Sequence, residues 1–440
     1  MIESSGESNW PAVAPESAIP SPSSFMAILL TALMMRAFCF LVAVGHPERF
    51  LTIDSHQYVA LVGHLRSAYF DPSSPDFAMG LFRTPGYPAF LAFLLNAFDG
   101  SLQMVIGLQI AIAVFGVGLA VLLASRLLGP RVGAMAGLML ALDPASILYA
   151  CFVQPDTLFT ALTVAGVLIW VRSVEGASLW AAVISGFVLG LAALTRPIGI
   201  FLPLMLPLTL MARSGATRRL GLAGCFLAGA FLPIGGWMAK NQVLTGSPVF
   251  TILGDSALLH YRAAGALAED EGIPIEEARD RVWKRFWSNN RPGASAVELS
   301  VAQRRLAFVI LSEHKGAAVR MMGRSAMRMA FGTGLTALSR LQGAKDPEAM
   351  DSPAKRVLTG LQLLIALIAS AAIARGSILL IGQRRFFEVS LLLGTAAYFL
   401  VVSAGPEANT RFRLPATPFL AILASHGLSR REVRDSAVHG

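Results

Sequence analysis

Charged residues are scarce in this chain. They make up only 14% of its 440 residues, whereas apolar residues make up 55% and the mean hydropathy is +0.61. This composition excludes a soluble domain of that length. The 36 Lys and Arg exceed the 27 Asp and Glu by nine. Most arginines fall in short loops between apolar stretches, so they indicate membrane topology rather than nucleic-acid binding.

Cysteine is also rare, and the common nucleotide motifs are missing. Cys39, Cys151 and Cys225 have no CxxC or zinc-like spacing, so the sequence predicts neither a disulfide nor a metal site from them. The chain has no Walker A sequence, and no GxGxxG follows a strand and opens a helix. These absences argue against cytoplasmic nucleotide binding and against transport driven by ATP.

The first 24 residues contain no Lys or Arg but many Ser and Pro, unlike the basic start of a secretory signal. We expect residues 1–24 to be a disordered cytoplasmic tail. Residues 429–440 are expected to be a cytoplasmic tail at the other end.

The apolar stretches are long enough to cross about 30 Å of hydrocarbon as helices. We therefore predict an all-α, polytopic membrane protein with about ten transmembrane helices, within a range of 10–12. The stretches are 25–45, 102–128, 132–150, 157–171, 179–194, 198–212, 220–239, 357–374, 386–404 and 414–428. They form an amino-terminal transmembrane module, 25–239, and a carboxy-terminal one, 357–428.

The positive-inside rule places both termini on the cytoplasmic side of the membrane. We expect this membrane to be a bacterial-type inner membrane. Two long segments, 46–101 and 240–356, then face the periplasm, and function should reside there. Apolar residues at helical spacing predict one surface helix over 58–69 and another over 275–287. Residues 88–98 fit a second surface helix or the start of a span, and 321–341 fit a re-entrant or interfacial element.

Short motifs punctuate these segments in a recognisable order. Asp54 follows the first span, and Asp156 opens the fourth. The motifs are Ile53-Asp54-Ser55-His56-Gln57-Tyr58, Arg83-Thr84-Pro85-Gly86-Tyr87-Pro88, Gln154-Pro155-Asp156, Leu194-Thr195-Arg196-Pro197, Ala239-Lys240-Asn241-Gln242 with Gly246 and Pro248, and Arg411-Phe412-Arg413-Leu414-Pro415. The chain resembles, collinearly over 25–428, the GT-C glycosyltransferases that use polyprenyl-phosphate sugars, in particular protein O-mannosyltransferases and lipid A aminoarabinose transferases.

The resemblance implies transfer of a sugar from a polyprenyl-phosphate donor to a lipid, glycan or protein acceptor on the periplasmic face, amid membrane lipids and without nucleic acid. By position, Asp54 is the implied catalytic base, and Asp156 is a second, auxiliary acid. Local sequence offers alternatives: Asp54 fits a helix N-cap with Gln57 in the capping box, and Asp156 fits a favourable helix start. Relatives often place a second acid after the first, but here Ser55 follows.

Cations at the outer ends of spans are the candidates for holding the donor phosphate. Each could instead snorkel or bind lipid headgroups. They are Arg83, Arg196, Lys240, Arg411 and Arg413, of which Arg83 and Arg411 match the family motifs best. The expected substrate contacts are His56, Gln57, Tyr58 and Tyr87. Arg36 lies inside the first span, where a cation usually pairs with a buried acid or snorkels.

No cofactor is required by this reading. A divalent metal is an alternative, but the separations of His46, His56 and His64 are not those of a helical metal motif. Two other classes of function stay open: a flippase or polytopic transporter of lipid-linked sugars, which also needs a cationic outer cavity, and a non-catalytic relative that scaffolds a partner enzyme.

Overall fold

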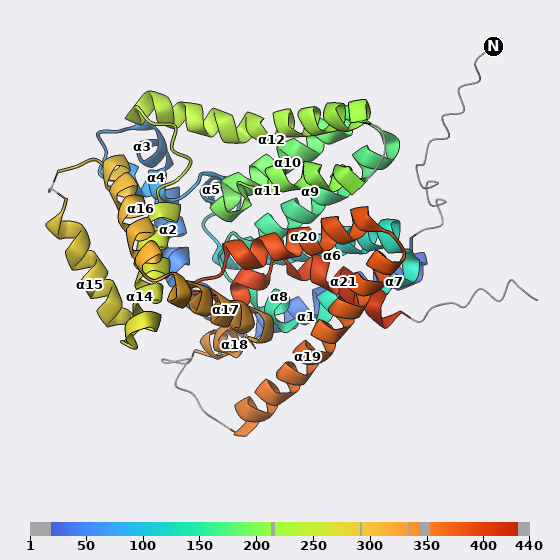
Figure 1. Cartoon of the computed structure of the whole chain (residues 1–440). Helices are drawn as coiled ribbons and strands as arrows, with labels where there is room; N and C mark the ends of the chain where they lie inside the picture. Colours follow the sequence, from blue (N-terminus) through green and yellow to red (C-terminus); the bar gives the residue numbers. More distant parts are fainter. Residues whose placement is uncertain (1–18, 213–215, 291–292, 333, 344–352, 430–440) are drawn as a thin grey trace, which may run out of the picture.

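The computed structural model describes residues 19–212, 216–290, 293–332, 334–343 and 353–429 (Figure 1). Every regular element in these ranges is helical, so the predicted all-α fold is confirmed. The predicted tails lie outside the described residues over 1–18 and 430–440. Residues 22–24, expected in the first tail, belong instead to the first helix, because Ser21 caps it and Pro22 opens it.

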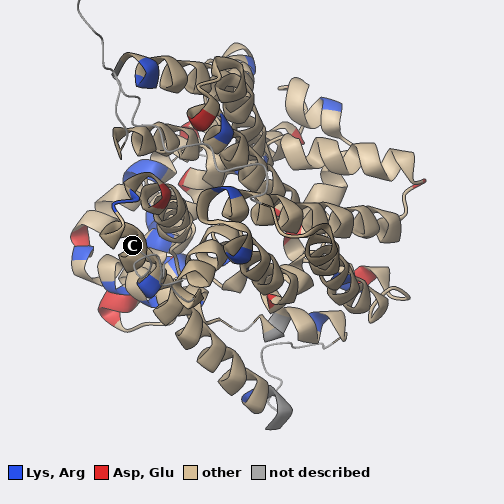
Figure 2. Cartoon of the chain, turned by 90° about the vertical axis from the view of Figure 1, so that its right-hand side faces the viewer, with Lys and Arg blue, Asp and Glu red and all other residues tan. Residues whose placement is uncertain are grey.

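Each of the ten predicted spans coincides with helical structure. Five helices are long and apolar enough to cross a membrane. They correspond to α1 (Pro22–Leu41), α6 (Leu102–Leu128), α9 (Asp156–Gly176), α12 (Ala216–Thr245) and α19 (Pro353–Gly382). Most of the helical surface carries no charged residue (Figure 2).

The other apolar helices are shorter. Three are single helices: α10 (Leu179–Thr195), α20 (Phe386–Val402) and α21 (Thr417–Leu428). The stretch predicted over 132–150 is two helices, α7 (Pro130–Leu142) and α8 (Pro144–Tyr149), because the Asp143 carboxylate accepts the Ser146 N–H at 2.8 Å and so caps a new helix.

The stretch predicted over 198–212 is not one helix either. It consists of η3 (Pro197–Gly199), α11 (Leu202–Met205) and η4 (Leu206–Ala212). Pro203 and Pro207 lack the N–H that a continuous α-helix would use, which accounts for the short pieces.

Small residues let the central helices approach closely. An added Cβ on Gly186 of α10 would lie 1.9 Å from the Phe226 carbonyl oxygen of α12, and one on Gly190 would lie 2.5 Å from the Ala230 oxygen. Gly186 and Gly190, four residues apart on one face of α10, therefore allow the close packing of α10 on α12. The buried Trp170 of α9 packs on Phe226 in the same core.

Arg36 is buried rather than snorkelling, and none of the ion pairs found among the described residues includes it. It is 1% exposed, and its guanidinium donates to the carbonyls of Leu140 and Ala141 at 3.3 and 3.4 Å. These carbonyls belong to the last turn of α7, where the helix dipole favours a positive charge. Arg36 therefore caps a helix inside the bundle.

The segment 46–101 folds as the 3-10 helix η2 (Pro47–Phe50) followed by four α-helices: α2 (Ile53–Val62), α3 (Leu65–Phe70), α4 (Phe77–Phe82) and α5 (Gly86–Ala97). The single surface helix predicted over 58–69 is wrong, because the chain turns at Gly63 and His64 between α2 and α3. The predicted apolar stretch over 88–98 is α5.

The segment 240–356 forms a set of helices that pack on one another (Figure 1). Its elements are α13 (Leu253–Ala257), η5 (Leu258–Ala263), α14 (Ala264–Glu271), α15 (Ile275–Ser288), α16 (Ala296–Glu313), α17 (Lys315–Phe331) and α18 (Leu335–Leu341). The predicted amphipathic helix over 275–287 is confirmed: α15 buries Ala278, Val282 and Phe286. The stretch over 321–341 is interrupted between α17 and α18.

Candidate active site

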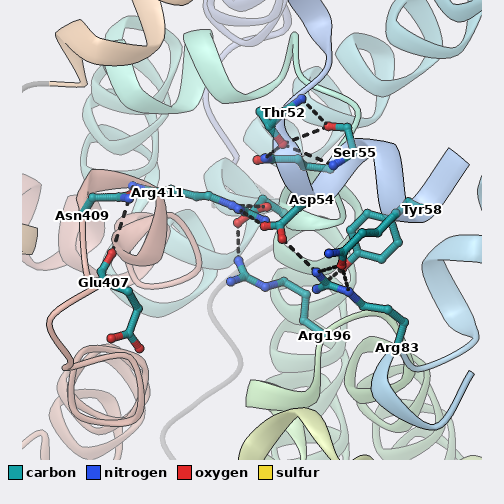
Figure 3. A network of polar contacts seen from close by, with 12 residues as sticks. Thr52, Asp54, Ser55, Tyr58, Arg83, Arg196, Glu407, Asn409 and Arg411 are labelled. Carbon is teal, nitrogen blue, oxygen red and sulfur yellow. Dashed lines mark hydrogen bonds and ion pairs between the residues drawn. The ribbon is translucent and has the colours of Figure 1, made fainter. Parts of the chain in front are cut away.

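Five of the predicted site residues meet in one ion-pair network, although they come from five separate segments. Asp54 lies in the first turn of α2, and Asp156 is the first residue of α9. Arg83 and Arg196 end α4 and α10, and Arg411 lies in the short helix η6 (Thr410–Arg413). Figure 3 shows the side chains of Asp54, Arg83, Arg196 and Arg411 converging.

Thr52, not Asp54, caps helix α2. The Thr52 hydroxyl accepts the Ser55 N–H at 3.3 Å, and the Ser55 hydroxyl accepts the Thr52 N–H at 2.9 Å (Figure 3). The predicted cap at Asp54 with Gln57 is therefore wrong, because the capping box begins two residues earlier. This arrangement leaves the Asp54 carboxylate available for the network, and it gives Ser55 a structural role.

Gln154 ties that cap to the start of α9. Its side-chain amide donates to the Thr52 hydroxyl at 2.6 Å, and Asp156 follows two residues later. Gln154 stands in one of the sequence motifs, yet no local signal shows that its partner would be Thr52. The bond joins the two chain segments that carry the aspartates.

Arg411 bridges the two aspartates. Its Nη1 donates to Asp54 Oδ2 at 2.7 Å, and its Nε donates to Asp156 Oδ2 at 2.9 Å. The Asn409 side chain accepts the Arg411 backbone N–H at 2.9 Å and so fixes the start of η6 (Figure 3). The planar, forked guanidinium suits this bridge, because it aims a different nitrogen at each carboxylate.

Arg83 holds Asp54 from the other side. Its Nη2 donates to Asp54 Oδ1 at 2.8 Å and to Gln57 Oε1 at 2.6 Å, and its Nη1 donates to the Tyr58 hydroxyl at 3.2 Å. The guanidinium also lies over the Tyr58 ring, 4.9 Å from the centroid. The predicted residues Gln57 and Tyr58 thus orient Arg83 from the same helix that carries Asp54.

Asp156 is enclosed at the inner end of the network. Its side chain is 0% exposed. Its Oδ1 forms an ion pair with Arg196, and its Oδ2 forms one with Arg411. A buried carboxylate needs this pairing, because an unpaired charge there would be costly. By contrast the Asp54 side chain is 34% exposed, so it is the carboxylate that faces outward.

The electrostatics follow from this geometry. Burial alone would raise the pKa of Asp54, but the charges and hydrogen bonds of Arg411 and Arg83 outweigh it and lower the pKa to about 2. Burial acts on Arg411 in the opposite sense, yet Asp156 and Asp54 raise its pKa above the usual range. Three guanidiniums face two carboxylates, so the network keeps one unbalanced positive charge.

Tyr87 lies behind the network rather than in it. It is 0% exposed, packs edge-on against Tyr58 with ring centroids 4.9 Å apart, and donates to Gln109 at 2.8 Å. Gln109 in turn donates to the Phe152 carbonyl at 2.8 Å. The structure therefore places Tyr87 as a support for Tyr58. Gln109 shares that role, and nothing in its local sequence predicted it.

Three further predicted residues have other contacts. Lys240 donates to the Tyr69 carbonyl at 2.8 Å and lies 3.8 Å from the centroid of the Trp237 ring. Arg413 donates to the Ala330 carbonyl at 2.7 Å and approaches Asp143 at 3.7 Å, so it joins η6 to α17 and α8. His56 is exposed on α2. These three side chains are therefore not members of the network.

A small cavity of about 60 Å³ adjoins Asp156. Its walls are mostly apolar, with Ile112, Val117 and Leu414 among them, and it reaches as far as Arg36. Within the described ranges, no three His, Cys, Asp or Glu side chains are grouped so that they could hold a metal ion. The site is thus an arginine-rich network with an apolar floor.

Residues 83–236 match a known family, described as dolichyl-phosphate-mannose-protein mannosyltransferase. That segment includes Arg83, Asp156 and Arg196. No curated protein sequence matches the chain.

Solved structures are similar in fold. The oligosaccharyltransferase AglB of Archaeoglobus fulgidus, in complex with an inhibitory peptide and a dolichol-phosphate, is 12% identical with a TM-score of 0.51, over 92% of this chain and 50% of that one. Its apo form gives 12% identity and a TM-score of 0.52 over the same shares. The chain spans about half the length of AglB. ArnT of Cupriavidus metallidurans, bound to undecaprenyl phosphate, is 15% identical over 92% of this chain and 76% of its own, with a TM-score of 0.41. The chain therefore shares the all-helical fold of the AglB oligosaccharyltransferase structures over 92% of its length, and its residues 83–236 carry the sequence pattern of the dolichyl-phosphate-mannose-protein mannosyltransferase family.

Proposed function

We propose that the chain is a membrane glycosyltransferase that moves a sugar from a polyprenyl-phosphate donor to an envelope acceptor on the periplasmic face. The observation that carries the proposal is the bridge from Arg411 to Asp54 and Asp156, at 2.7 and 2.9 Å. It joins an outward-facing carboxylate to guanidiniums suited to phosphate, which are the two parts this reaction needs. The dolichol-phosphate in the AglB structure supports a lipid phosphate as the class of donor.

Asp54 is the proposed base of a single, inverting displacement. As the acceptor oxygen or nitrogen forms its bond to the anomeric carbon, its proton passes to Asp54. The bond from that carbon to the phosphate oxygen breaks, and the electron pair stays on the phosphate. Arg83 and Arg411 stabilise the negative charge that develops there. Asp54 suits the role because its carboxylate is the accessible one, 34% exposed.

Asp156 has a different proposed role. Its carboxylate is 0% exposed and saturated by Arg196 and Arg411, so it has no direct path to an acceptor. We assign it the task of holding both arginines in place. The neighbouring apolar cavity suits the hydrocarbon next to the donor phosphate, because Ile112, Val117 and Leu414 line it.

The experiment measures sugar transfer from a labelled polyprenyl-phosphate sugar to envelope acceptors, using the full chain at matched membrane expression. Asp54→Asn should lose about 10²-fold or more of the transfer rate, since a positioned base contributes about 10² to 10⁴. Asp71→Asn is the matched control, because Asp71 is an exposed acid of the same segment, 46–101, and its carboxylate accepts hydrogen bonds from Ser73 rather than from the network.

Full transfer by Asp54→Asn would remove Asp54 as the base. If neither the parent nor the variant consumes donor, while the parent moves the lipid-linked sugar between leaflets, the transporter is the correct function. The flippase alternative needs a cationic cavity as well, so donor consumption is the measurement that separates the two.

A further inference from the structure

Asp54 is fully engaged in the structure. Oδ1 accepts from Arg83 at 2.8 Å and Oδ2 accepts from Arg411 at 2.7 Å, so each carboxylate oxygen has its own guanidinium. A carboxylate held in this way has little affinity for a proton. Asp54 therefore cannot serve as a base for the proposed reaction while both contacts last.

The same two guanidiniums are the ones best placed for the donor phosphate. Carboxylate and phosphate oxygens present similar acceptor geometry to an arginine fork, so the two anions compete for it. The side chains of Arg83 and Arg411 are only 10% and 14% exposed, whereas Asp54 is 34% exposed. An anion arriving from outside therefore reaches the guanidiniums at the place that Asp54 occupies.

Both arginines have second anchors that survive the loss of Asp54. Arg83 keeps its bonds to Gln57 at 2.6 Å and to the Tyr58 hydroxyl at 3.2 Å. Arg411 keeps Asp156 at 2.9 Å through a different nitrogen. Exchange of one anion for another thus breaks two bonds to Asp54 and leaves the rest of the network standing.

We infer that Asp54 is an internal placeholder for the donor phosphate: its carboxylate occupies Arg83 and Arg411 until the phosphate displaces it, and displacement frees it to act as the base. This inference rests on the proposed function and adds its regulation. Without donor, Asp54 stays paired and activates neither water nor acceptor. With donor, the negative phosphate lies beside the released carboxylate, and like charge raises its proton affinity.

The placeholder predicts an unusual effect of mutation on the affinity for phosphate. Because Asp54 competes with the ligand, removing its charge should strengthen phosphate binding while it weakens transfer. We would measure the Kd of sugar-free polyprenyl phosphate for the full chain in nanodiscs. Asp54→Asn should bind at least about tenfold more tightly than the parent, and Asp54→Glu, which keeps the charge, should stay nearer to it. Asp71→Asn should match the parent.

Weaker or unchanged binding by Asp54→Asn would overturn the placeholder, whatever happens to transfer. If Asp54→Asn does not give a folded, monodisperse protein, Asp54→Ala tests the same prediction with the same expected sign. The role of Asp54 as base fails separately: a variant that binds more tightly and still transfers sugar at the parental rate keeps the competition for the arginines but removes the base. A variant with impaired transfer and no gain in binding keeps the base and removes the placeholder.

Discussion

Among the described residues, Arg411 is the one whose guanidinium donates hydrogen bonds to both Asp54 and Asp156. Lysine at this position keeps the charge, but its single nitrogen replaces the two guanidinium nitrogens that separately donate to Asp54 and Asp156 at 2.7 and 2.9 Å. We expect Arg411→Lys to lower the transfer rate about 10²-fold, a loss typical of removing one electrostatic donor. The measurement is the transfer assay with purified protein.

Arg413→Lys is the matched control, because Arg413 lies in the same short helix η6 but donates to the Ala330 carbonyl instead. We expect its rate to stay within about threefold of the parent, since its contact stabilises η6 without touching either aspartate. Equal losses in the two variants would mean that the integrity of η6, rather than the bridge, sets the rate.

The sequence predicted which residues matter better than it predicted what they contact. Asp54, Arg83, Asp156 and Arg411 were all named from motifs, and all four lie in the network. Asp54 and Arg411 are 357 positions apart, so no local pattern could pair them. Arg413 was grouped with Arg411 because both are arginines of one motif, yet the two side chains leave η6 in different directions.

At the scale of elements, the turn between α4 and α5 shows why the Pro-Gly motif is there. An added Cβ on Gly86 would lie 2.6 Å from the Leu194 carbonyl oxygen and 2.8 Å from the Thr195 nitrogen, which are backbone atoms at the end of α10. Arg83 precedes this glycine and Arg196 follows those atoms. The close approach therefore brings two arginines of the network to one place.

Gly86→Ala should separate the two segments. We expect a loss of about 1 to 3 kcal/mol of stability from overpacking, because the clashing atoms are backbone. The change should appear as a lower melting temperature in detergent, with reduced transfer. Gly107→Ala is the control: Gly107 lies within α6 with open space around it, so alanine there should leave the melting temperature unchanged or raise it. A Gly86→Ala protein as stable and active as the parent would contradict this account.

Periodicity and length predicted where helices occur but not where they break. The stretch over 132–150 contains Asp143-Pro144, a cap and a helix start that an average of hydropathy does not register. The surface helix over 58–69 failed at Gly63 for the same reason, since apolar spacing continues across the turn. Both errors have the same cause. The spacing of apolar residues predicts which side of a helix is buried, whereas the residue at which a helix ends depends on individual backbone hydrogen bonds.

The topology of the whole molecule stays a prediction that labelling can check. Single cysteines at Glu298 and Gln383 would be probed with a membrane-impermeant maleimide in intact cells and after permeabilisation. We expect Glu298→Cys, in the late outer segment, to react in intact cells, and Gln383→Cys, between α19 and α20, to react only after permeabilisation. The parent is the background control, because Cys39 and Cys151 are buried and Cys225 is partly buried. The reverse labelling pattern would mean that the protein has the opposite orientation in the membrane.

Several helices that lead to the network are short. At 1.5 Å per residue, the 13 residues of α7, 17 of α10 and 12 of α21 give lengths of about 20, 26 and 18 Å, against about 30 Å of hydrocarbon. If they start at the inner surface, their outer ends stop below the level of the lipid headgroups. The bilayer would then be thinned locally over the site, and the donor phosphate would reach the arginines below the usual level of the headgroups. Acceptors of the proposed reaction would then have to enter this thinned region, which would favour those with a reactive group at the end of a slender, extended portion.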